Sequence, residues 1–246
     1  WAYAEGCVMQ ANTLVCRITG PARALLTAER PALNFLQLLS ATATSAQRHA
    51  KAIEGASPNP RGCQVLDTRK TIPGLRQAQK YAVRVGGGAN QRMALWDGIL
   101  IKENHIAAAG GIRQALEAAR ALNAGVSIQI EVESLKELQQ ALDAGAESVL
   151  LDNFSLDQMR EAVAFTARHA ALRTSSASFE ADSAALTSNE SREGTKPIVP
   201  ALLEASGGLG LEDLRAVAAT GVDLISLGRL TKDVKAVDFS MRIVSA

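Results

Sequence analysis

The chain has 246 residues, a formal net charge of +1 and 47% hydrophobic residues, which gives an ordinary globular composition with enough apolar material for a barrel-sized domain. A net charge so close to zero argues against a general attraction to nucleic acid or to an anionic membrane. No apolar run approaches the length of a membrane span, so we expect neither nucleic acid nor a membrane among the partners.

The cysteines and the first residues indicate the compartment. Cys7, Cys16 and Cys63 are scattered and show no Cys-x-x-Cys spacing, which is typical of reduced thiols rather than of a disulfide framework or a zinc site. Residues 1–6 do not resemble a signal peptide, and the chain does not begin with Met. We therefore expect a cytoplasmic protein, and we expect this sequence to begin inside a longer chain.

Residues 1–63 predict a partial amino-terminal α/β domain. Apolar and polar residues alternate weakly over residues 1–19, which predicts one or two short strands. Apolar residues then recur at three- or four-residue spacing over residues 27–55, and Gly55 suits a helix end, so we expect one long helix. A turn-rich stretch at 57–62 separates this domain from the next.

Strand and helix patterns alternate from residue 64 to residue 235. Ser134 with Glu137, and Ser155 with Gln158, have the spacing of capping boxes, which mark helix starts. Strands that alternate with helices predict a parallel sheet, and this many units favour a barrel. The expected fold is α/β, an open or incomplete (β/α) barrel with a smaller α/β amino-terminal domain to which residues 236–246 return. The predicted strands are 65–68, 98–102, 126–132, 148–151, 198–203 and 222–227.

Residues 173–196 interrupt the alternation. This segment is rich in Ser, Ala, Thr and Glu and has no apolar period. It predicts a mobile insertion between a helix and a strand of the barrel, for which a tolerated surface loop is the simplest explanation.

Polar residues stand at the carboxyl ends of the predicted strands, where α/β barrels form their active sites because the loops converge there. Charged side chains at nearly every strand end are unexpected if the loops only have to be soluble, so the pattern predicts a site. The residues are Arg69, Lys70, Lys102, Glu131, Glu133, Asp152, Asn153, Glu204, Ser206, Gly207, Gly208 and Gly228.

The residue types indicate a ligand with several negative charges. Arginine forks suit carboxylates and phosphates and lysines act as point charges, while the carboxylates of Glu131 and Asp152 could hold Mg²⁺ against a polyphosphate. Backbone N–H groups at 206–208 and at Gly228 could receive a phosphate. This combination suggests phosphoribosyl transfer, which needs a metal-held pyrophosphate leaving group and charge to stabilise an oxocarbenium-like transition state. The basic set consists of Arg69, Lys70, Arg92 and Lys102.

Each element has a simpler explanation when it is taken alone. An Arg-Lys pair is usually solvated surface, and the glycines at 86–88 are more often a helix stop than a ligand loop. We expect His105 to be a structural hydrogen-bonding residue rather than a general base, and His49 and His169 to be surface or packing residues. The predicted site therefore depends on the joint placement of its members.

Ordered sequence blocks resemble quinolinate phosphoribosyltransferases over almost the whole chain. The string DTRKTIPGLR at 67–76, followed by QKYAV at 79–83, is similar to that family's most recognisable signature. ERPALNFLQ at 29–37 resembles the start of its interface helix. The other blocks, in family order, are GGGANQR at 86–92, LIKENH at 100–105, EVES at 131–134, LLDNF at 150–154, LEASGG at 203–208 and TGVDLISLGRLT at 220–231.

The resemblance implies an enzyme of de novo NAD biosynthesis that converts quinolinate and phosphoribosyl pyrophosphate into nicotinate mononucleotide, pyrophosphate and CO₂. It also implies a homodimer or larger assembly with shared active sites, since Arg30 would reach the site of a neighbouring subunit. The quaternised ring nitrogen would stabilise the carbanion left by decarboxylation, so no Schiff-base lysine is needed. By resemblance, quinolinate is bound by Arg30, Arg69, Gln91, Arg92 and Lys102. The ribose, the pyrophosphate and Mg²⁺ are surrounded by Lys70, Glu131 and Asp152, of which Glu131 and Asp152 are metal ligands. The 5′-phosphate is bound by Ser206, Gly207, Gly208 and Gly228.

The chain departs from the family pattern at three places. Family members often have His where this chain has Gln91, which can donate a hydrogen bond to a carboxylate but cannot carry a proton. The insertion at 173–196 is longer than the family pattern predicts. Family members also have further residues before position 1, and without them the cover over the partner's site would be incomplete.

Three other functions agree with parts of the pattern. A phosphoribosyltransferase for nicotinate or another anionic ring would have a similar architecture, but a monocarboxylate would leave some of the cations buried without partners. An aldolase-type enzyme would use Lys70 or Lys102 as a Schiff-base lysine. A non-catalytic scaffold would agree with Gln91 and with the missing amino-terminal segment, but not with the intact basic and acidic residues.

Overall fold

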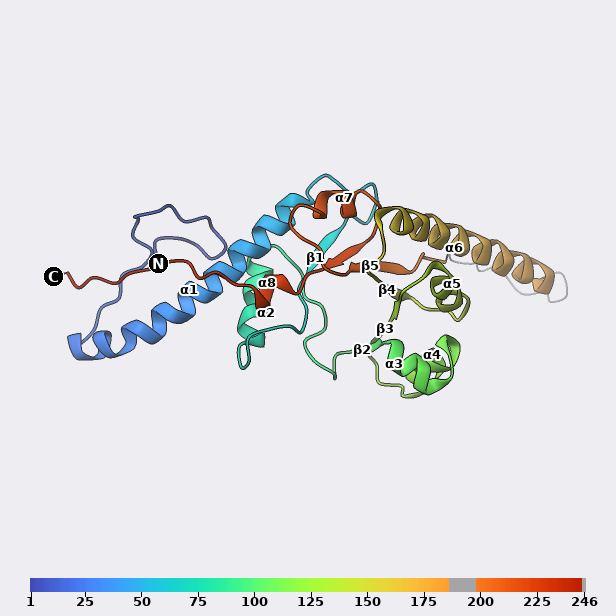
Figure 1. Cartoon of the computed structure of the whole chain (residues 1–246), viewed down its shortest axis with the longest axis horizontal. Coiled ribbons are helices and arrows are strands. Elements are labelled where there is room, and N and C mark those ends of the chain that lie inside the picture. The colour runs from blue at the N-terminus through green and yellow to red at the C-terminus, as the bar shows by residue number, and fades with distance from the viewer. Residues whose placement is uncertain (186–197, 245–246) are drawn as a thin grey trace. The chain divides into compact units, whose positions relative to one another are not determined.

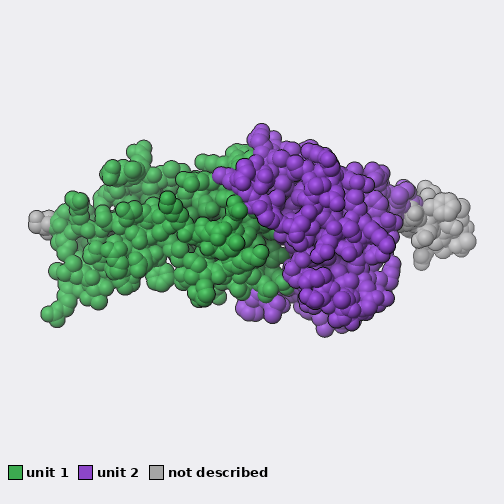
Figure 2. Space-filling model, in the orientation of Figure 1, with its two compact units in different colours: residues 1–54, 64–93, 226–246 green, residues 55–63, 94–225 purple. Residues whose placement is uncertain are grey.

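The computed structural model describes residues 1–185 and 198–244, and the chain divides into two compact units. Unit 1 consists of residues 1–54, 64–93 and 226–246, and unit 2 of residues 55–63 and 94–225 (Figure 2). Among the described residues, no helix combines the length and the apolar character needed to cross a membrane.

The strands form one six-stranded parallel sheet. The first and second strands of the sequence lie at its two edges, so the sheet is not closed, and the prediction of an open or incomplete barrel is confirmed. The order is β1 (Gln64–Leu66), β6 (Leu224–Ser226), β5 (Leu202–Ser206), β4 (Ser148–Asp152), β3 (Ser127–Val132) and β2 (Gly98–Ile101).

Strand alternation in unit 2 separates an apolar from a polar face. Successive strand residues point to opposite faces, so residues paired across parallel strands share a face. One face carries apolar residues that are at most 3% exposed, namely Ile101, Ile130, Val132, Val149, Leu151, Leu203 and Ala205. The other, which we call the polar face, carries Gln129, Glu131, Ser148, Asp152, Glu204 and Ser206, with Leu100, Leu150 and Leu202 among them.

In unit 1 the helix α1 (Ala22–Ala52) packs against α2 (Arg76–Val85), and both contact the short helix α8 (Arg229–Lys232). The predicted long helix is thus confirmed, although it begins earlier than residue 27. Gly86 ends α2, as the helix-stop interpretation predicted, and a side chain there would collide with the backbone oxygen of Ala43 in α1. Glycine therefore allows the end of α2 to approach α1 closely.

The prediction of short strands within residues 1–19 is wrong, because this described segment has no strand. One backbone hydrogen bond, 2.8 Å from the N–H of Ala2 to the oxygen of Val15, spans it. The segment is tied to α2 instead, since the hydroxyl of Tyr81 donates to Glu5 at 2.6 Å. A weak alternation forms a strand only where another strand is available for pairing.

Two helices of unit 2 begin at the predicted cap residues Ser134 and Ser155. The N–H of Gln158 donates to Ser155 Oγ at 3.3 Å and the N–H of Ser155 donates to Gln158 Oε1 at 2.8 Å, a complete capping box. At α5 the N–H of Glu137 donates to Ser134 Oγ at 3.2 Å, but Glu137 Oε2 accepts from the N–H of Glu133 instead of Ser134. The helices are α3 (Glu103–Ala109), α4 (Ile112–Ala121), α5 (Leu135–Asp143), α6 (Leu156–Ala185) and α7 (Leu214–Ala218).

Helix α6 extends into the expected insertion. Residues 173–185 continue this helix (Figure 1), which the absence of an apolar period did not predict. Residues 186–196 of the expected insertion lie outside the described residues. Its mobility stays a prediction, as do the domain boundaries at 63 and 235, although the contacts place residues 64–93 in one unit with residues 1–54.

Candidate active site

The central contact of the predicted site in unit 2 is an ion pair between Lys102 and Glu131. Lys102 follows β2 directly, and the register that pairs Ile101 with Ile130 brings the next residue of each strand side by side. Lys102 Nζ lies 2.6 Å from Glu131 Oε2 and 2.9 Å from Oε1, so both carboxylate oxygens accept from one ammonium. The lysine side chain is 42% exposed and the glutamate 10%, which leaves the cation open to a ligand.

His105 supports the backbone at Lys102. Its Nδ1 accepts a hydrogen bond of 3.0 Å from the backbone N–H of Lys102, at the start of α3. An accepting Nδ1 carries no proton, so the neutral ring has its N–H at Nε2. This hydrogen bond agrees with the structural role predicted for His105.

A second carboxylate on the polar face, Glu204, is buried below the strand ends and only 2% exposed. Gln129 Nε2 donates to Glu204 Oε2 at 2.8 Å and contacts Ser148 Oγ at 3.2 Å. These residues join β3, β4 and β5 through their side chains. Glu204, which the sequence placed at a strand end, therefore takes part in the interior of the sheet.

Asn153 holds the segment Ser206–Gly208 beside Asp152. Its φ of 55° is left-handed, its N–H donates to the oxygen of Ser206 at 3.0 Å, and its Nδ2 donates to Asp152 Oδ2 at 2.8 Å. Gly207 has a φ of 119°, and a Cβ there would collide with Asn153 Oδ1. The glycine is required both by its backbone conformation and by this close approach.

Substitution of Gly207 by alanine is therefore expected to destabilise the protein by about 1–3 kcal/mol. The new Cβ would collide with Asn153 Oδ1, and alanine would be strained at a φ that L-residues rarely adopt. Gly208→Ala is the matched control, since nothing lies within 4 Å of a Cβ at that neighbouring position. Urea denaturation of both variants measures the difference. Equal stability of the two would contradict this account of the segment.

In unit 1 the loop that carries Arg69 and Lys70 is held from α2. The guanidinium of Arg76 donates to the oxygen of Arg69 at 3.2 Å, to Thr71 Oγ1 at 3.2 Å and to the oxygen of Met93 at 3.4 Å. Arg69 is half-buried and Lys70 exposed. The Arg76 side chain thus fixes the loop and the chain just beyond Arg92.

Gly228 lies against Lys70. A Cβ at this position would be 2.9 Å from Lys70 Cδ and 3.5 Å from Thr68 Oγ1, while the φ of Gly228 is an ordinary −63°. Glycine is thus needed here for space, and it allows the lysine stem to pass over the start of α8.

A buried ion pair between Asp67 and Lys80 connects the residues just before Arg69 with the residues just before Arg92. Lys80 Nζ lies 2.5 Å from Asp67 Oδ1, and both side chains are 0% exposed. Asn90 Nδ2 donates to Asp67 Oδ2 at 2.6 Å, the N–H of Gln91 donates to Oδ1 at 3.0 Å, and Lys80 donates to the oxygen of Gln91 at 2.7 Å. Burial raises the pKa of the Asp67 carboxyl, and the hydrogen bond and charge of Lys80 oppose that rise. The pair holds the backbone of Gln91, the residue before Arg92.

Arg30 lies apart from these contacts on an exposed face of α1. It lines an apolar groove of about 380 Å³ together with Pro31, Asn34, Phe35, Leu38 and Leu75. Phe35 is 52% exposed. No hydrogen bond or ion pair within residues 1–185 and 198–244 involves the Arg30 side chain.

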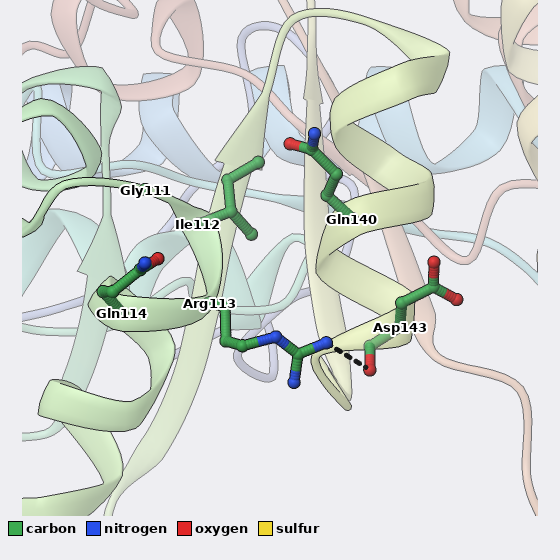
Figure 3. A pocket seen from close by; sticks show the side chains of 6 residues that line it. All are labelled: Gly111, Ile112, Arg113, Gln114, Gln140 and Asp143. Atoms are coloured by element: carbon green, nitrogen blue, oxygen red, sulfur yellow. Dashed lines mark hydrogen bonds between the residues drawn. The ribbon is translucent and has the colours of Figure 1, made fainter.

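A second cavity, of about 290 Å³, contains none of the predicted site residues. It is lined by Gly111, Ile112, Arg113, Gln114, Gln140 and Asp143 (Figure 3). Arg113 donates to the backbone oxygen of Asp143 at 3.3 Å across it. The predicted site is therefore a set of strand-end residues rather than this cavity.

Two carboxylates of the polar face are candidates for holding a metal, although one of them, Glu131, is paired with Lys102. Among the described residues no group of three His, Cys, Asp or Glu side chains could hold a metal ion. Glu131 and Asp152 lie on neighbouring strands and share the polar face. Mg²⁺ commonly takes one or two carboxylates together with substrate phosphates, so these residues fit a metal that arrives with a polyphosphate.

The sequence analysis did not predict the structural roles of several residues that hold the site in place. Asp67, Arg76 and Lys80 belong to the quoted signature, but their partners could not be assigned from it. A lysine on the buried side of α2 was the one available signal, because a buried lysine requires a partner. Asn153 was noted only as a strand-end residue, although its asparagine type is typical of a left-handed position.

Comparisons with known proteins agree on one family. The model for the quinolinate phosphoribosyl transferase C-terminal domain matches residues 42–242, and that for the N-terminal domain matches residues 1–40. A probable carboxylating nicotinate-nucleotide pyrophosphorylase of Bacillus subtilis is 38% identical over 97% of this chain and 71% of its own length. The human carboxylating nicotinate-nucleotide pyrophosphorylase is 35% identical over 99% of this chain and 72% of its own length. The crystal structure of NadC from Streptococcus pyogenes, 36% identical, superimposes with a TM-score of 0.79 over 98% of this chain and 72% of that one.

Proposed function

Because the chain belongs to the quinolinate phosphoribosyltransferase family, we propose that it transfers the phosphoribosyl group of phosphoribosyl pyrophosphate to quinolinate and releases pyrophosphate and CO₂. The product would be nicotinate mononucleotide, a step of NAD biosynthesis. The observation that carries the proposal is the row of Lys102, Glu131 and Asp152 at the carboxyl ends of β2, β3 and β4. A cation beside carboxylates at adjacent strand ends suits an anionic ring that meets a metal-bound polyphosphate.

Quinolinate's carboxylates would be bound by the basic residues. Lys102 would exchange the Glu131 carboxylate for a substrate carboxylate, since its side chain is 42% exposed and its ammonium suits an anionic ligand. Arg69 and Arg92 suit bidentate recognition of carboxylates. Gln91 can add a hydrogen bond but no charge. A dicarboxylate matches this set better than a monocarboxylate does.

The reaction would proceed in two balanced steps. The ring nitrogen of quinolinate attacks C1′ of the ribose, and the bond from C1′ to the pyrophosphate oxygen breaks as the electron pair leaves with pyrophosphate. The bond to the carboxylate next to the ring nitrogen then breaks, CO₂ leaves, and the ring carbon takes a proton from water. Lys70, Glu131 and Asp152 would stabilise the charge that develops on the ribose and the leaving group.

We also propose that Glu131 and Asp152 hold Mg²⁺. The ion would neutralise charge on the pyrophosphate leaving group. The release of Glu131 from Lys102 when a substrate carboxylate arrives would make that carboxylate available to the metal. The N–H groups of Ser206, Gly207, Gly208 and Gly228 would receive the 5′-phosphate, as open backbone donors at glycines suit phosphate.

The proposed assembly is a homodimer with shared active sites, in which Arg30 reaches the quinolinate of the partner subunit. The exposed position of Arg30 on α1, within an apolar groove, supports this, because an apolar surface beside a cation suits a protein contact better than open water. A cytoplasmic location belongs to the same proposal. It is supported by the three free cysteines, since free thiols are the usual state in reducing compartments.

The test is to incubate the protein with quinolinate, phosphoribosyl pyrophosphate and Mg²⁺ and to follow nicotinate mononucleotide and CO₂ together. We expect equal amounts of both products with quinolinate, none with nicotinate, and none after chelation of the metal. Lys102→Met should lower kcat/KM for quinolinate about 10- to 100-fold, because a hydrogen bond to a charged group contributes about 1.5–3 kcal/mol and the variant cannot donate one to the substrate carboxylate. Lys136→Met, at an exposed lysine of α5, is the control and should leave the rate unchanged.

The rival functions give different results in the same assay. Product from nicotinate would favour a monocarboxylate enzyme. Borohydride trapping of a carbonyl substrate on Lys70 or Lys102 would favour the aldolase reading. No product from a verified full-length protein would exclude the proposed reaction.

A further inference from the structure

A single buried amide in unit 1 connects the two segments to which the proposed function assigns phosphate and ribose binding. Gln79 lies in α2 with 0% of its surface exposed. Its Oε1 accepts from the N–H of Ile72 at 2.8 Å, and its Nε2 donates to the backbone oxygen of Thr231 at 2.7 Å. Ile72 follows the Arg69–Lys70 loop, and Thr231 belongs to α8, which starts after Gly228.

Thr231 closes the link from the other side. Its side chain is buried, with 0% exposed, and its Oγ1 donates to the backbone oxygen of Lys70 at 2.9 Å. The backbone on both sides of Thr71 is therefore bound, at Lys70 by Thr231 and at Ile72 by Gln79. We call Gln79 and Thr231 the clamp.

The orientation of the Gln79 amide follows from its partners. The backbone N–H of Ile72 can only donate and the carbonyl of Thr231 can only accept, so a flipped amide would place like groups together at both ends. Both partners are main-chain groups, and a buried main-chain group without a hydrogen bond costs about 1–3 kcal/mol. The clamp therefore specifies one arrangement of the loop relative to α8.

The clamp also determines what Lys70 can reach. A Cβ at Gly228 would be 2.9 Å from Lys70 Cδ, so the lysine stem passes directly over the start of α8. A lysine side chain is flexible, and the position of its ammonium is narrowed by fixing its backbone and giving its stem a surface. Gln79 and Thr231 belong to the quoted blocks QKYAV and TGVDLISLGRLT, but their hydrogen-bond partners could not be assigned from the sequence.

We propose that Gln79 and Thr231 are positioning residues that hold the Lys70 loop against α8, so that the ammonium of Lys70 and the N–H groups at Gly228 meet the same phosphoribosyl pyrophosphate molecule. The inference rests on the proposed function, which places Lys70 and Gly228 at that substrate. The clamp touches no substrate and acts through Lys70. Its loss should lower the rate because a displacement of about 1 Å can cost about 100-fold.

The test uses Gln79→Met, which keeps the volume of the side chain and removes both of its hydrogen bonds. Gln77→Met is the matched control, since Gln77 is exposed on the same helix. Amide hydrogen exchange of peptides covering residues 70–72 should be faster in Gln79→Met and unchanged in Gln77→Met. This readout does not depend on turnover, so it judges the clamp separately from the reaction.

The second readout is kcat/KM for phosphoribosyl pyrophosphate. Gln79→Met should lower it about 10- to 100-fold, with no further loss when the same change is made in a Lys70→Ala background. That non-additivity is expected only if Gln79 acts through Lys70. Unchanged exchange at residues 70–72, or an equal loss in both backgrounds, would overturn the inference. If neither the wild-type protein nor any variant shows turnover while amide hydrogen exchange at residues 70–72 changes as expected, the proposed reaction and the positioning role are both wrong. The clamp would then be only a structural link.

Discussion

Replacement of Lys80 by methionine is expected to lower the free energy of unfolding by about 3–5 kcal/mol, because it leaves the Asp67 carboxylate buried without its ion-pair partner. Both side chains have no exposed surface, so water cannot take the place of the ammonium. The variant should also lose activity, since the pair holds the backbone of Gln91 just before Arg92. Urea denaturation followed by circular dichroism measures the change in stability.

The matched control is the double variant Asp67→Asn with Lys80→Met, which removes both charges. It should recover much of the lost stability, because a neutral buried pair no longer carries an uncompensated charge. Lys136→Met, on an exposed part of α5, should change stability by no more than about 0.5 kcal/mol. A Lys80→Met protein as stable as this surface variant would show that the buried pair is not what holds the loop.

The loss caused by Lys80→Met should depend on pH. Burial already raises the pKa of Asp67, and removal of the opposing ammonium raises it further. A carboxyl whose pKa is higher in the folded than in the unfolded chain binds its proton more tightly when folded. The variant therefore keeps its stability at low pH and loses it as the pH rises above the pKa that Asp67 has in the unfolded chain. The destabilisation by Lys80→Met should be smaller in mildly acidic buffer than at neutral pH.

Mixing two inactive variants should restore activity if active sites are shared between subunits. Arg30→Ala removes the residue proposed to act in trans, and Arg69→Ala removes a residue proposed for the receiving site. In a mixed dimer one site combines the intact Arg69 of one chain with the intact Arg30 of the other. Random exchange of subunits should therefore return about a quarter of the wild-type activity, as the symmetry of a two-fold dimer requires.

Arg69→Ala mixed with Arg92→Ala is the matched control for this experiment. Both residues are proposed for the same side of the site, so each site in the mixed dimer keeps one defect and no activity should return. Recovery in the control would indicate that Arg69 and Arg92 serve different subunits. Failure of the Arg30 mixture to recover, with subunit exchange verified by differently tagged chains, would place Arg30 in its own chain's site.

The sequence predicted the six strands of residues 64–235 and the helices α2, α4, α5, α6 and α7, because each of these carries its own local signal, whereas the short helices α3 and α8 were not predicted. Apolar runs mark the strands, helical spacing marks the helices, and the Ser155/Gln158 box marks the start of α6. The largest shift in a strand was at 198–203, where β5 is Leu202–Ser206. Pro200 has no N–H to donate to a strand ladder, so the paired segment begins after it.

Local signals failed in two segments. The alternation in residues 1–19 lacked a strand to pair with, and the stretch from 173 to 185 took the helical state of the helix before it despite its polar composition. The helix was extended because its Ser, Ala and Glu residues do not forbid helix, and an apolar period is needed only for packing.

By itself the sequence determined the fold class, the family and the chemical types of residue at the strand ends, because these depend on local pattern and on the identity of side chains. Tertiary structure alone decided which residues meet. Lys102 pairs with Glu131 because of strand register, Asp67 with Lys80 because α2 returns beside β1, and Gln79 with Thr231 across a separation of 152 positions. Such contacts form only when distant segments pack, and no spacing within one segment specifies them.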